Sequence, residues 1–241
     1  MKYVLILLVF VLNSKVQCQI PAHRLGNWNM ISGVDTAFAP LYVQVSDFNA
    51  SNSKNIDSAL NKAIQFVASQ GGGTVLIDAG VFYLTRPVVL KSHVRVKGIG
   101  PSTEIHLKFG QNTWSGFELK GNRLNHKLEF DSISSKTIFT KSNINDSNLK
   151  LVKFNYNDTD LMNNSWAYGT VGQLLKVKQI IGNRIELDDS IHLSEAGKKQ
   201  INFSAFNPII HASVECLSII RDDSAHGQAS NILIENAYMC R

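Results

Sequence analysis

Asp222, Asp223 and His226 are the residues of this sequence whose types and spacing come closest to a catalytic group. Two carboxylates and an imidazole can give and take protons, which is what general acid–base catalysis requires. All three residues fall in one polar stretch between two apolar runs, and such stretches commonly form solvated turns. The pattern leaves two interpretations open, a proton-transfer site and a surface turn.

Motifs for zinc, nucleotides and activated nucleophiles do not occur in the sequence. The seven histidines show neither an HExxH pattern nor a paired spacing, so no metal site is expected. A Walker loop, a dinucleotide-binding glycine pattern and a Gly-x-Ser-x-Gly sequence are also missing, so no cofactor is evident. Trp114, Trp166 and Tyr168 could stack on sugar rings, but core packing is the favoured interpretation because aromatic side chains are mostly buried.

The N-terminus has the pattern of a secretory signal peptide over residues 1–18. Met1-Lys2 give a positive start, Tyr3 to Leu12 are all apolar, and a short polar break follows. We expect cleavage between Cys18 and Gln19, with a lipoprotein acylated on Cys18 and a buried N-terminal segment as alternatives. The protein is therefore expected to be secreted, periplasmic or on the cell surface. No other segment is long and apolar enough to span a membrane.

Composition and charge limit the classes of molecule that the protein is expected to bind. Loss of residues 1–18 removes Lys2 and Lys15 and no acid, so the formal net charge falls from +5 to +3. No cluster of Lys and Arg stands out, and nucleic-acid binding, which needs a basic stripe, is not expected. Charged residues make up 18% of the chain, below the usual quarter. Asn and Ser are plentiful instead, which is typical of the turns of exported all-β proteins.

Two cysteines remain once the signal peptide is removed. Export permits a disulfide between Cys216 and Cys240. Their spacing carries no signature of a disulfide framework, so a pair of small buried thiols is the favoured alternative.

One amphipathic helix is predicted over residues 56–69. Its apolar residues recur three and four positions apart, which places them on one helix face. They are Ile56, Ala59, Leu60, Ala63, Ile64 and Val67. Asn55 can cap the start, and the glycines at 71–73 can end the helix because glycine readily takes left-handed dihedrals.

Short strands precede and follow this helix. After residue 73 the spacing of apolar residues changes from the helical three to four positions to two positions, which predicts strands. No helix separates these strands, which argues against a βαβ sheet. The expected strands are 42–45, 74–78, 81–84, 88–90, 94–97 and 103–107. Strands this short and closely spaced are typical of a solenoid or a sandwich.

The rest of the chain divides into an insertion and a return to the earlier pattern. Residues 19–41 are expected to form an extended entry segment, 42–119 the helix and first strands, and 120–205 a small inserted β subdomain. Within it, residues 172–180 and 184–187 predict a hairpin across Gly182-Asn183. Residues 206–241 resume short strands at 214–220 and 231–236.

The order of motifs over residues 45–107 resembles the N-terminal part of pectate-lyase-superfamily proteins, and among these the rhamnogalacturonase/epimerase-like pectate lyase domains. The motifs are Asp47-Phe48-x-Ala50, the helix that begins near Asp57-Ser58, Gly71-Gly72-Gly73-Thr74-Val75, Ala79 to Leu84, Leu90 to Val94 and Lys97 to Thr103. The resemblance implies an all-β fold, a right-handed parallel β-helix whose first coils are capped by the helix and interrupted by the insertion. Asn49 departs from the family pattern, which usually has glycine there.

This resemblance implies a polysaccharide lyase or glycoside hydrolase that acts on an acidic plant or algal glycan, with calcium as a cofactor of the lyase. We expect the exported protein to be a monomer. Asp222-Asp223 and His226-Gly227 are similar to the Asp-Asp and Gly-His-Gly patterns of polygalacturonase-like relatives. In these relatives the aspartates and the histidine lie on different coils, so the short spacing between Asp222 and His226 does not match. The alternative is a non-catalytic, adhesin-like protein that binds glycans or is displayed on the surface.

The last residues, Met239 to Arg241, show no segment that would cover the final strands. We therefore expect the sequence to be the N-terminal fragment of a longer protein, with its catalytic residues beyond Arg241. On this view the fragment by itself is inactive.

Overall fold

The structure is a computed structural model that describes residues 39–49, 53–124, 129–156, 164–167, 171–192, 201–222, 227 and 229–241. The predicted signal peptide, its cleavage site at Cys18 and Gln19, and most of the entry segment lie outside these residues. A search of the described residues finds no helix with the length and apolar character needed to cross a membrane.

Nearly all described elements are strands. In chain order the elements are β1 (Tyr42–Gln44), η3 (Val45–Phe48), α1 (Asp57–Ser69), β2 (Gly73–Leu76), β3 (Gly80–Leu84), β4 (Val88–Val89), β5 (Val94–Lys97), η4 (Gly100–Ser102), β6 (Thr103–Leu107), β7 (Phe117–Lys120), β8 (Asn122–Leu124), β9 (Phe130–Ile133), β10 (Thr137–Thr140), β11 (Leu151–Tyr156), η5 (Ser165–Ala167), β12 (Val171–Ile181), β13 (Arg184–Leu187), β14 (Asn202–Asn207), β15 (Ile209–Ile210), β16 (Ser213–Glu215), β17 (Ser218–Arg221), β18 (Ile232–Glu235) and β19 (Ala237–Tyr238).

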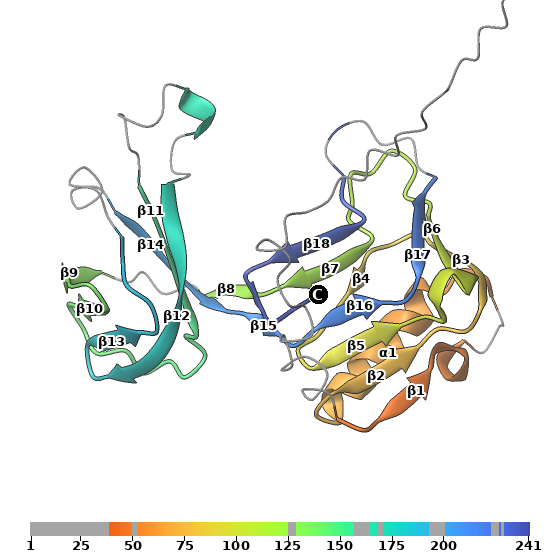
Figure 1. Cartoon of the computed structure of the whole chain (residues 1–241), viewed down its shortest axis with the longest axis horizontal. Coiled ribbons are helices and arrows are strands. Elements are labelled where there is room, and N and C mark those ends of the chain that lie inside the picture. The colour runs from red at the N-terminus through yellow and green to blue at the C-terminus, as the bar shows by residue number, and fades with distance from the viewer. Residues whose placement is uncertain are drawn as a thin grey trace, which may run out of the picture. The chain divides into compact units, whose positions relative to one another are not determined.

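Four sheets contain only parallel pairings. Their strand orders are β1-β2-β5-β16, β17-β6-β3, β18-β7-β4 and β15-β19. Figure 1 shows that the strands within each of the first three sheets lie side by side. The register keeps like residues in line, so that Val75 pairs with Val96 and Val96 with Val214. Because side chains alternate along a strand, this alignment sends one row of aliphatic side chains into a shared core.

The helix prediction is confirmed, since α1 spans Asp57–Ser69. Its apolar stripe buries Leu60, Ile64 and Val67 completely in the core of the parallel sheets. Asp57 ties its first turn to the chain after β3, because the Asp57 carboxylate accepts hydrogen bonds from the Thr85 amide at 3.2 Å and hydroxyl at 2.7 Å. Asn55, the predicted cap, accepts a hydrogen bond from the Asp57 amide.

Close approach of neighbouring chain segments requires glycine at two corners of these sheets. A Cβ atom at Gly98 would lie 2.5 Å from the carbonyl oxygen of Cys216, and one at Gly116 would lie 2.7 Å from that of Asn231. Such distances are well inside van der Waals contact, so a larger residue would push the stacked segments apart.

The largest sheet is antiparallel. Its strand order is β8-β14-β11-β12-β13-β10-β9, and it has a core of its own that includes Phe154, Val152 and Ile185. The predicted hairpin is confirmed, because β12 and β13 pair antiparallel across the turn at residues 182–183. Of the two turn residues only Gly182 takes a positive φ, of 61°.

The predicted fold class is wrong. The described residues are mostly β but form mixed sheets: one seven-stranded antiparallel sheet and several short parallel ones, and a clear right-handed parallel β-helix is not shown among them. Hydrophobic alternation predicts where strands lie and which face is buried, but it carries no information about which strands pair or in which direction.

Cys216 and Cys240 are free thiols in the structure. Cys216 is exposed, so it is not one of two buried thiols. Cys240 is half-buried, and burial raises the pKa of its thiol, which keeps it protonated.

Candidate functional site

Asp222 lies beside His106, a residue far from it in the sequence. It is the first residue after β17, and its carboxylate Oδ2 lies 2.5 Å from His106 Nδ1. Asp223 and His226, the other two predicted site residues, lie outside the described residues. The structure therefore connects one of the three candidates to a histidine 116 positions away.

The strand pattern of β6 explains why His106 and Glu104 face outward. Ile105 and Leu107 are fully buried, and the residues between them must point to the opposite face of the strand. β17 pairs with β6 in parallel, and the ladder continues past its end because the Asp222 amide donates to the Leu107 carbonyl at 3.0 Å. This last ladder bond places the Asp222 carboxylate on the same outward face.

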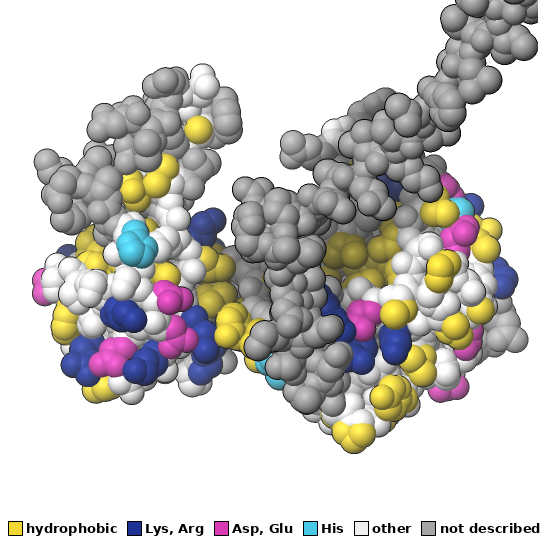
Figure 2. Space-filling view, viewed as in Figure 1, with side chains coloured by type: hydrophobic (Ala, Val, Ile, Leu, Met, Phe, Trp, Pro, Cys, Tyr) yellow, Lys and Arg dark blue, Asp and Glu magenta, His cyan; other side chains and the backbone are white. Residues whose placement is uncertain are grey.

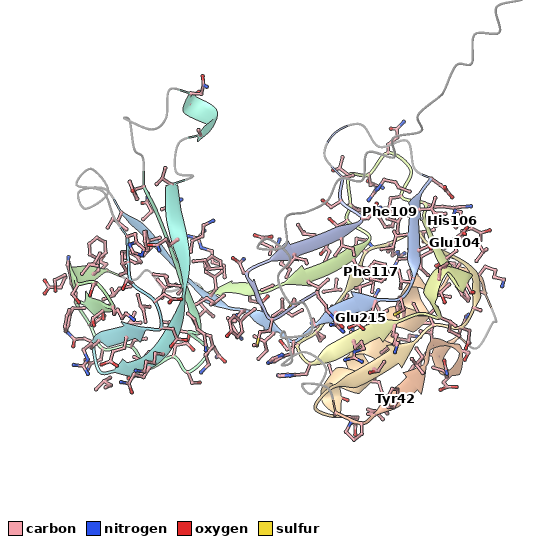
Figure 3. All side chains as sticks on the ribbon, in the orientation of Figure 1. Tyr42, Glu104, His106, Phe109, Phe117 and Glu215 are labelled. Atoms are coloured by element: carbon pink, nitrogen blue, oxygen red, sulfur yellow. The ribbon has the colours of Figure 1, made fainter. Side chains whose placement is uncertain are left out.

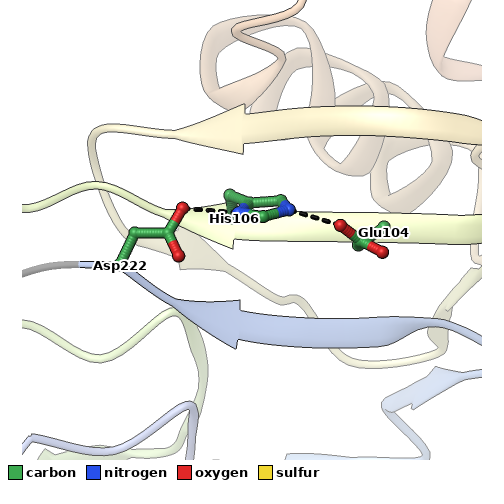
Figure 4. Close-up of polar contacts among 3 residues, drawn as sticks. All are labelled: Glu104, His106 and Asp222. Carbon is green, nitrogen blue, oxygen red and sulfur yellow. Dashed lines mark hydrogen bonds and ion pairs between the residues drawn. The ribbon is translucent and has the colours of Figure 1, made fainter.

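Both nitrogens of the His106 ring contact carboxylates. Nε2 lies 2.5 Å from Glu104 Oε1, and Nδ1 lies 2.5 Å from Asp222 Oδ2. Figure 4 draws both contacts, with the ring between the two carboxylates. The hydrogen bond to Glu104, followed by that to Asp222 and by the charge of both, raises the pKa of His106 against the opposing effect of desolvation. A doubly hydrogen-bonded ring with a raised pKa favours the imidazolium, which donates from both nitrogens.

Tyr83 and Lys108 extend this cluster along the sheet. Tyr83 on β3 pairs with His106, and the two rings meet edge to face with centroids 5.9 Å apart. Lys108 Nζ lies 3.9 Å from the centroid of the Tyr83 ring. Figure 3 places Glu104 and His106 on β6, on the outer side of the sheet. We call Glu104, His106 and Asp222 the His106 cluster.

Together with Tyr83, the His106 cluster combines hydrogen-bond acceptors, a cationic donor and an aromatic hydroxyl on one accessible face. The side chains of Glu104 and Asp222 are each 35% exposed, and that of His106 is 18% exposed. Groups of this kind can bind the hydroxyl groups of a sugar and can exchange protons with it. Among the described residues, no three or more His, Cys, Asp or Glu side chains are grouped so that they could hold a metal ion.

Trp114 does not pack in the core as predicted, because it is 44% exposed. It lies in the connection between β6 and β7, where its ring meets Phe109 edge to face at 6.0 Å. The side chain of Trp166 and the whole of Tyr168 lie outside the described residues.

Charges of both signs are mixed over the face drawn in Figure 2, where Lys and Arg side chains form no continuous basic stripe. The prediction that the protein does not bind nucleic acid concerns the whole surface and stays a prediction.

Sequence reasoning missed Glu104 and His106. The signal that could have found them is the alternation in Thr103–Leu107, which already places both residues on the face opposite the core. What the sequence does not give is the pairing of β6 with β17 that brings Asp222 to the same face.

No known protein family matches the chain, and no curated protein is similar to it in sequence. The fold is similar to solved structures of phage tailspikes. The gp61 tailspike of Pseudomonas phage phi297 aligns with a TM-score of 0.58 at 14% identity over 82% of this chain. The gp54 tailspike of Acinetobacter baumannii bacteriophage AP22, in complex with A. baumannii capsular saccharide, aligns with a TM-score of 0.50 at 12% identity over 83% of this chain. The gp49 tailspike of Pseudomonas phage LKA1 aligns with a TM-score of 0.50 at 16% identity over 69%.

The alignments cover 38%, 36% and 27% of the three tailspike chains, so this chain spans well under half the length of each. At these identities the likeness concerns the fold. The resemblance to pectate lyases stays a prediction.

Proposed function

We propose that this protein is exported and binds a polysaccharide through the outward face of the β3-β6-β17 sheet, around the His106 cluster. The observation that carries the proposal is the arrangement of Glu104, His106 and Asp222, which puts two carboxylates and an imidazole on one accessible face. The fold likeness to a tailspike solved with a capsular saccharide supports a glycan as the ligand.

Within this class we propose an acidic polysaccharide. The formal charge of +3 expected after signal removal and the resemblance to pectate lyases support an anionic ligand. Glu104 and Asp222 would repel a sugar carboxylate placed beside them. The sugar units at the His106 cluster would therefore contribute hydroxyl groups, and their acidic groups would point away from it.

A second candidate function is cleavage of the bound glycan, as a lyase or a hydrolase. The observation that favours it is that His106, with its raised pKa, can hold a proton between two carboxylates at the surface. Such a group can protonate a leaving oxygen or, once neutral, accept a proton from the sugar. Glycoside hydrolases commonly use two carboxylates, which this face also has.

Affinity electrophoresis of the purified protein tests the proposal. Native gels would contain polygalacturonate, alginate, hyaluronan, dextran or A. baumannii capsular polysaccharide, and we expect slower migration in at least one acidic polymer. Glu104→Gln and Asp222→Asn should weaken the retardation. Glu235→Gln is the matched control, because Glu235 lies on β18 in a different sheet and is 47% exposed.

The outcomes separate the candidates. Normal migration of the wild-type protein in every gel would overturn the proposed function. Retardation in dextran alone would overturn the acidic class. Reducing ends or unsaturated products that appear with the wild type but not with His106→Asn would establish cleavage, whereas retardation without products would leave binding as the function.

Export is tested by the mature N-terminus. We expect a chain that begins at Gln19, and a lipid on Cys18 would instead support the lipoprotein alternative. A secreted or periplasmic chain that retains Met1 would contradict both.

A further inference from the structure

An exposed indole lies at the corner that follows the His106 cluster. Trp114 is 44% exposed, whereas Phe109, which its ring contacts, is only 3% exposed and belongs to the core. The edge-to-face contact between them, with centroids 6.0 Å apart and an interplanar angle of 62°, supports the indole from one side and leaves much of it open to water.

The backbone of Trp114 is fixed by Arg221. The Arg221 guanidinium donates through Nη2 to the Trp114 carbonyl at 2.9 Å and to the Ser230 carbonyl at 2.9 Å. It also lies 5.5 Å from the centroid of the Phe109 ring. One side chain therefore joins the loop before β7 to the loop before β18 and fixes the backbone that carries the indole.

The chain on the C-terminal side of Trp114 is equally constrained. Ser115 is 9% exposed, and the amide of Gly116 donates to the Ser230 carbonyl at 3.1 Å. Gly116 itself admits no side chain, because a Cβ atom there would meet the Asn231 carbonyl at 2.7 Å. The indole is thus presented by a fixed backbone, which lowers the entropy lost when a ligand binds to it.

Trp114 lies in the loop that follows β6, and Asp222 follows the end of β17, the strand paired with β6. Arg221, which holds Trp114, directly precedes Asp222, and Phe109 follows His106 by three positions. A polymer that follows the carboxyl ends of β6 and β17 would pass the His106 cluster and the loop that carries Trp114. Aromatic surfaces combined with a few polar groups are what ligand sites commonly provide.

We propose that Trp114 is the stacking platform for one pyranose ring of a bound polysaccharide, at a subsite next to the His106 cluster. The inference deepens the proposed function and rests on it. The C–H face of a pyranose is apolar and fits against the face of an indole, while its hydroxyl groups remain free for Glu104 and Asp222.

Affinity gels of Trp114 variants test the inference. The gels contain the same polymers: polygalacturonate, alginate, hyaluronan, dextran and A. baumannii capsular polysaccharide. Trp114→Ala should weaken retardation in the polymer that retards the wild type by roughly tenfold, because stacking of a fixed ring is lost. Trp114→Phe should keep most of the affinity. Trp114→Leu should behave like alanine, because leucine supplies apolar area without an aromatic face.

Tyr42→Ala is the matched control. Tyr42 is an aromatic residue on β1 that is 65% exposed and belongs to the sheet of β1, β2, β5 and β16. Its removal should leave retardation unchanged. Thermal unfolding of each variant checks the fold, and Trp114→Phe keeps the test valid where the alanine variant does not fold.

The outcomes distinguish the inference from the proposed function. Wild-type retardation that persists unchanged in Trp114→Ala would overturn the stacking platform and leave glycan binding intact. An equal loss in Tyr42→Ala and Trp114→Ala would also overturn it, because general adhesion of exposed aromatics would explain both. Absence of wild-type retardation in every polymer would overturn the two proposals together.

Discussion

The parallel sheets and the antiparallel sheet differ in how the chain connects their paired strands. In the parallel part β6 pairs with β17, so residues more than a hundred positions apart become neighbours. In the antiparallel part β12 and β13 pair across a turn of two residues. Distant pairing is not confined to parallel strands, since antiparallel β8 and β14 also pair Leu124 with Ala205. The comparison teaches that parallel pairing always needs a connecting segment, here at least the 21 positions from Gly73 to Val94, whereas an antiparallel pair can also be a hairpin of residues close in sequence.

Loss of a large core side chain is the strongest way to test whether the two regions are stable separately. Phe117 and Phe154 are both fully buried, the first in the parallel core and the second in the antiparallel core. Each substitution to alanine should lower the free energy of unfolding by about 3–5 kcal/mol.

Hydrogen exchange would show where each substitution acts. Phe154→Ala should speed exchange in β11, β12 and β14 and leave β2, β5 and β6 protected, with Phe117→Ala giving the reverse. Equal loss of protection in both sets of strands would show that the two cores unfold as one unit.

Glycine substitutions test how tightly neighbouring segments approach in each region. Gly98→Ala would place a Cβ atom 2.5 Å from the Cys216 carbonyl oxygen, and Gly172→Ala would place one 2.0 Å from that of Phe154. Each should cost about 1–3 kcal/mol in denaturant unfolding, because the backbone has to move.

Gly110→Ala is the control for the glycine series. Gly110 has a positive φ of 64° but open space around its Cβ position. It should cost about 1 kcal/mol, from backbone conformation alone. A larger loss for Gly110→Ala than for Gly98→Ala would contradict the close approach as the cause.

The pH dependence of stability tests the long-range contact at His106. The folded-state pKa of His106 is raised above its ordinary value of 6.5, chiefly by the hydrogen bonds to Glu104 and Asp222, so these pairs stabilise the protein fully below pH 6.5. This stabilisation is lost as the pH rises through the folded-state pKa.

His106→Asn should therefore destabilise the protein more at pH 6 than at alkaline pH. His192→Asn is the control, because His192 is exposed and lies outside the parallel sheets. A difference between wild type and His106→Asn that grows with rising pH would contradict the ion pairs of His106.

The smallest effect is expected at an exposed ion pair between the parallel strands β7 and β18. Lys120 Nζ and Glu235 Oε2 lie 3.1 Å apart, but their side chains are 51% and 47% exposed. Glu235→Gln should change the free energy of unfolding by about 0–1 kcal/mol, since water screens such pairs. A loss comparable to that of Gly98→Ala would mean that this edge is more constrained than its exposure indicates.

Much of the local structure was predictable from the sequence. The apolar spacing in Asp57–Ser69 and the glycines after it predicted the helix to within one residue of its start. The turn at Gly182-Asn183 predicted the hairpin of β12 and β13. Both depend on residues a few positions apart, where helix period and turn chemistry dominate.

The candidate site was predicted only in part. Asp222 was singled out together with Asp223 and His226, which lie outside the described residues. The structure adds His106, itself hydrogen-bonded to Glu104. Trp114 was expected in the core and is 44% exposed. Aromatic side chains are usually buried, so the residue type predicts burial. The exposure of a given ring depends on which loop lies beside it.

The sequence by itself determined the helix, the positions of most short strands and the outward direction of Glu104 and His106, because these follow from periodicity over a few residues. Only the tertiary structure decided that β17 pairs with β6 and that Asp222 therefore meets His106. Pairing of distant parallel strands depends on the closure of long chain segments and on packing in a shared core, and neither is encoded in the local pattern of one strand.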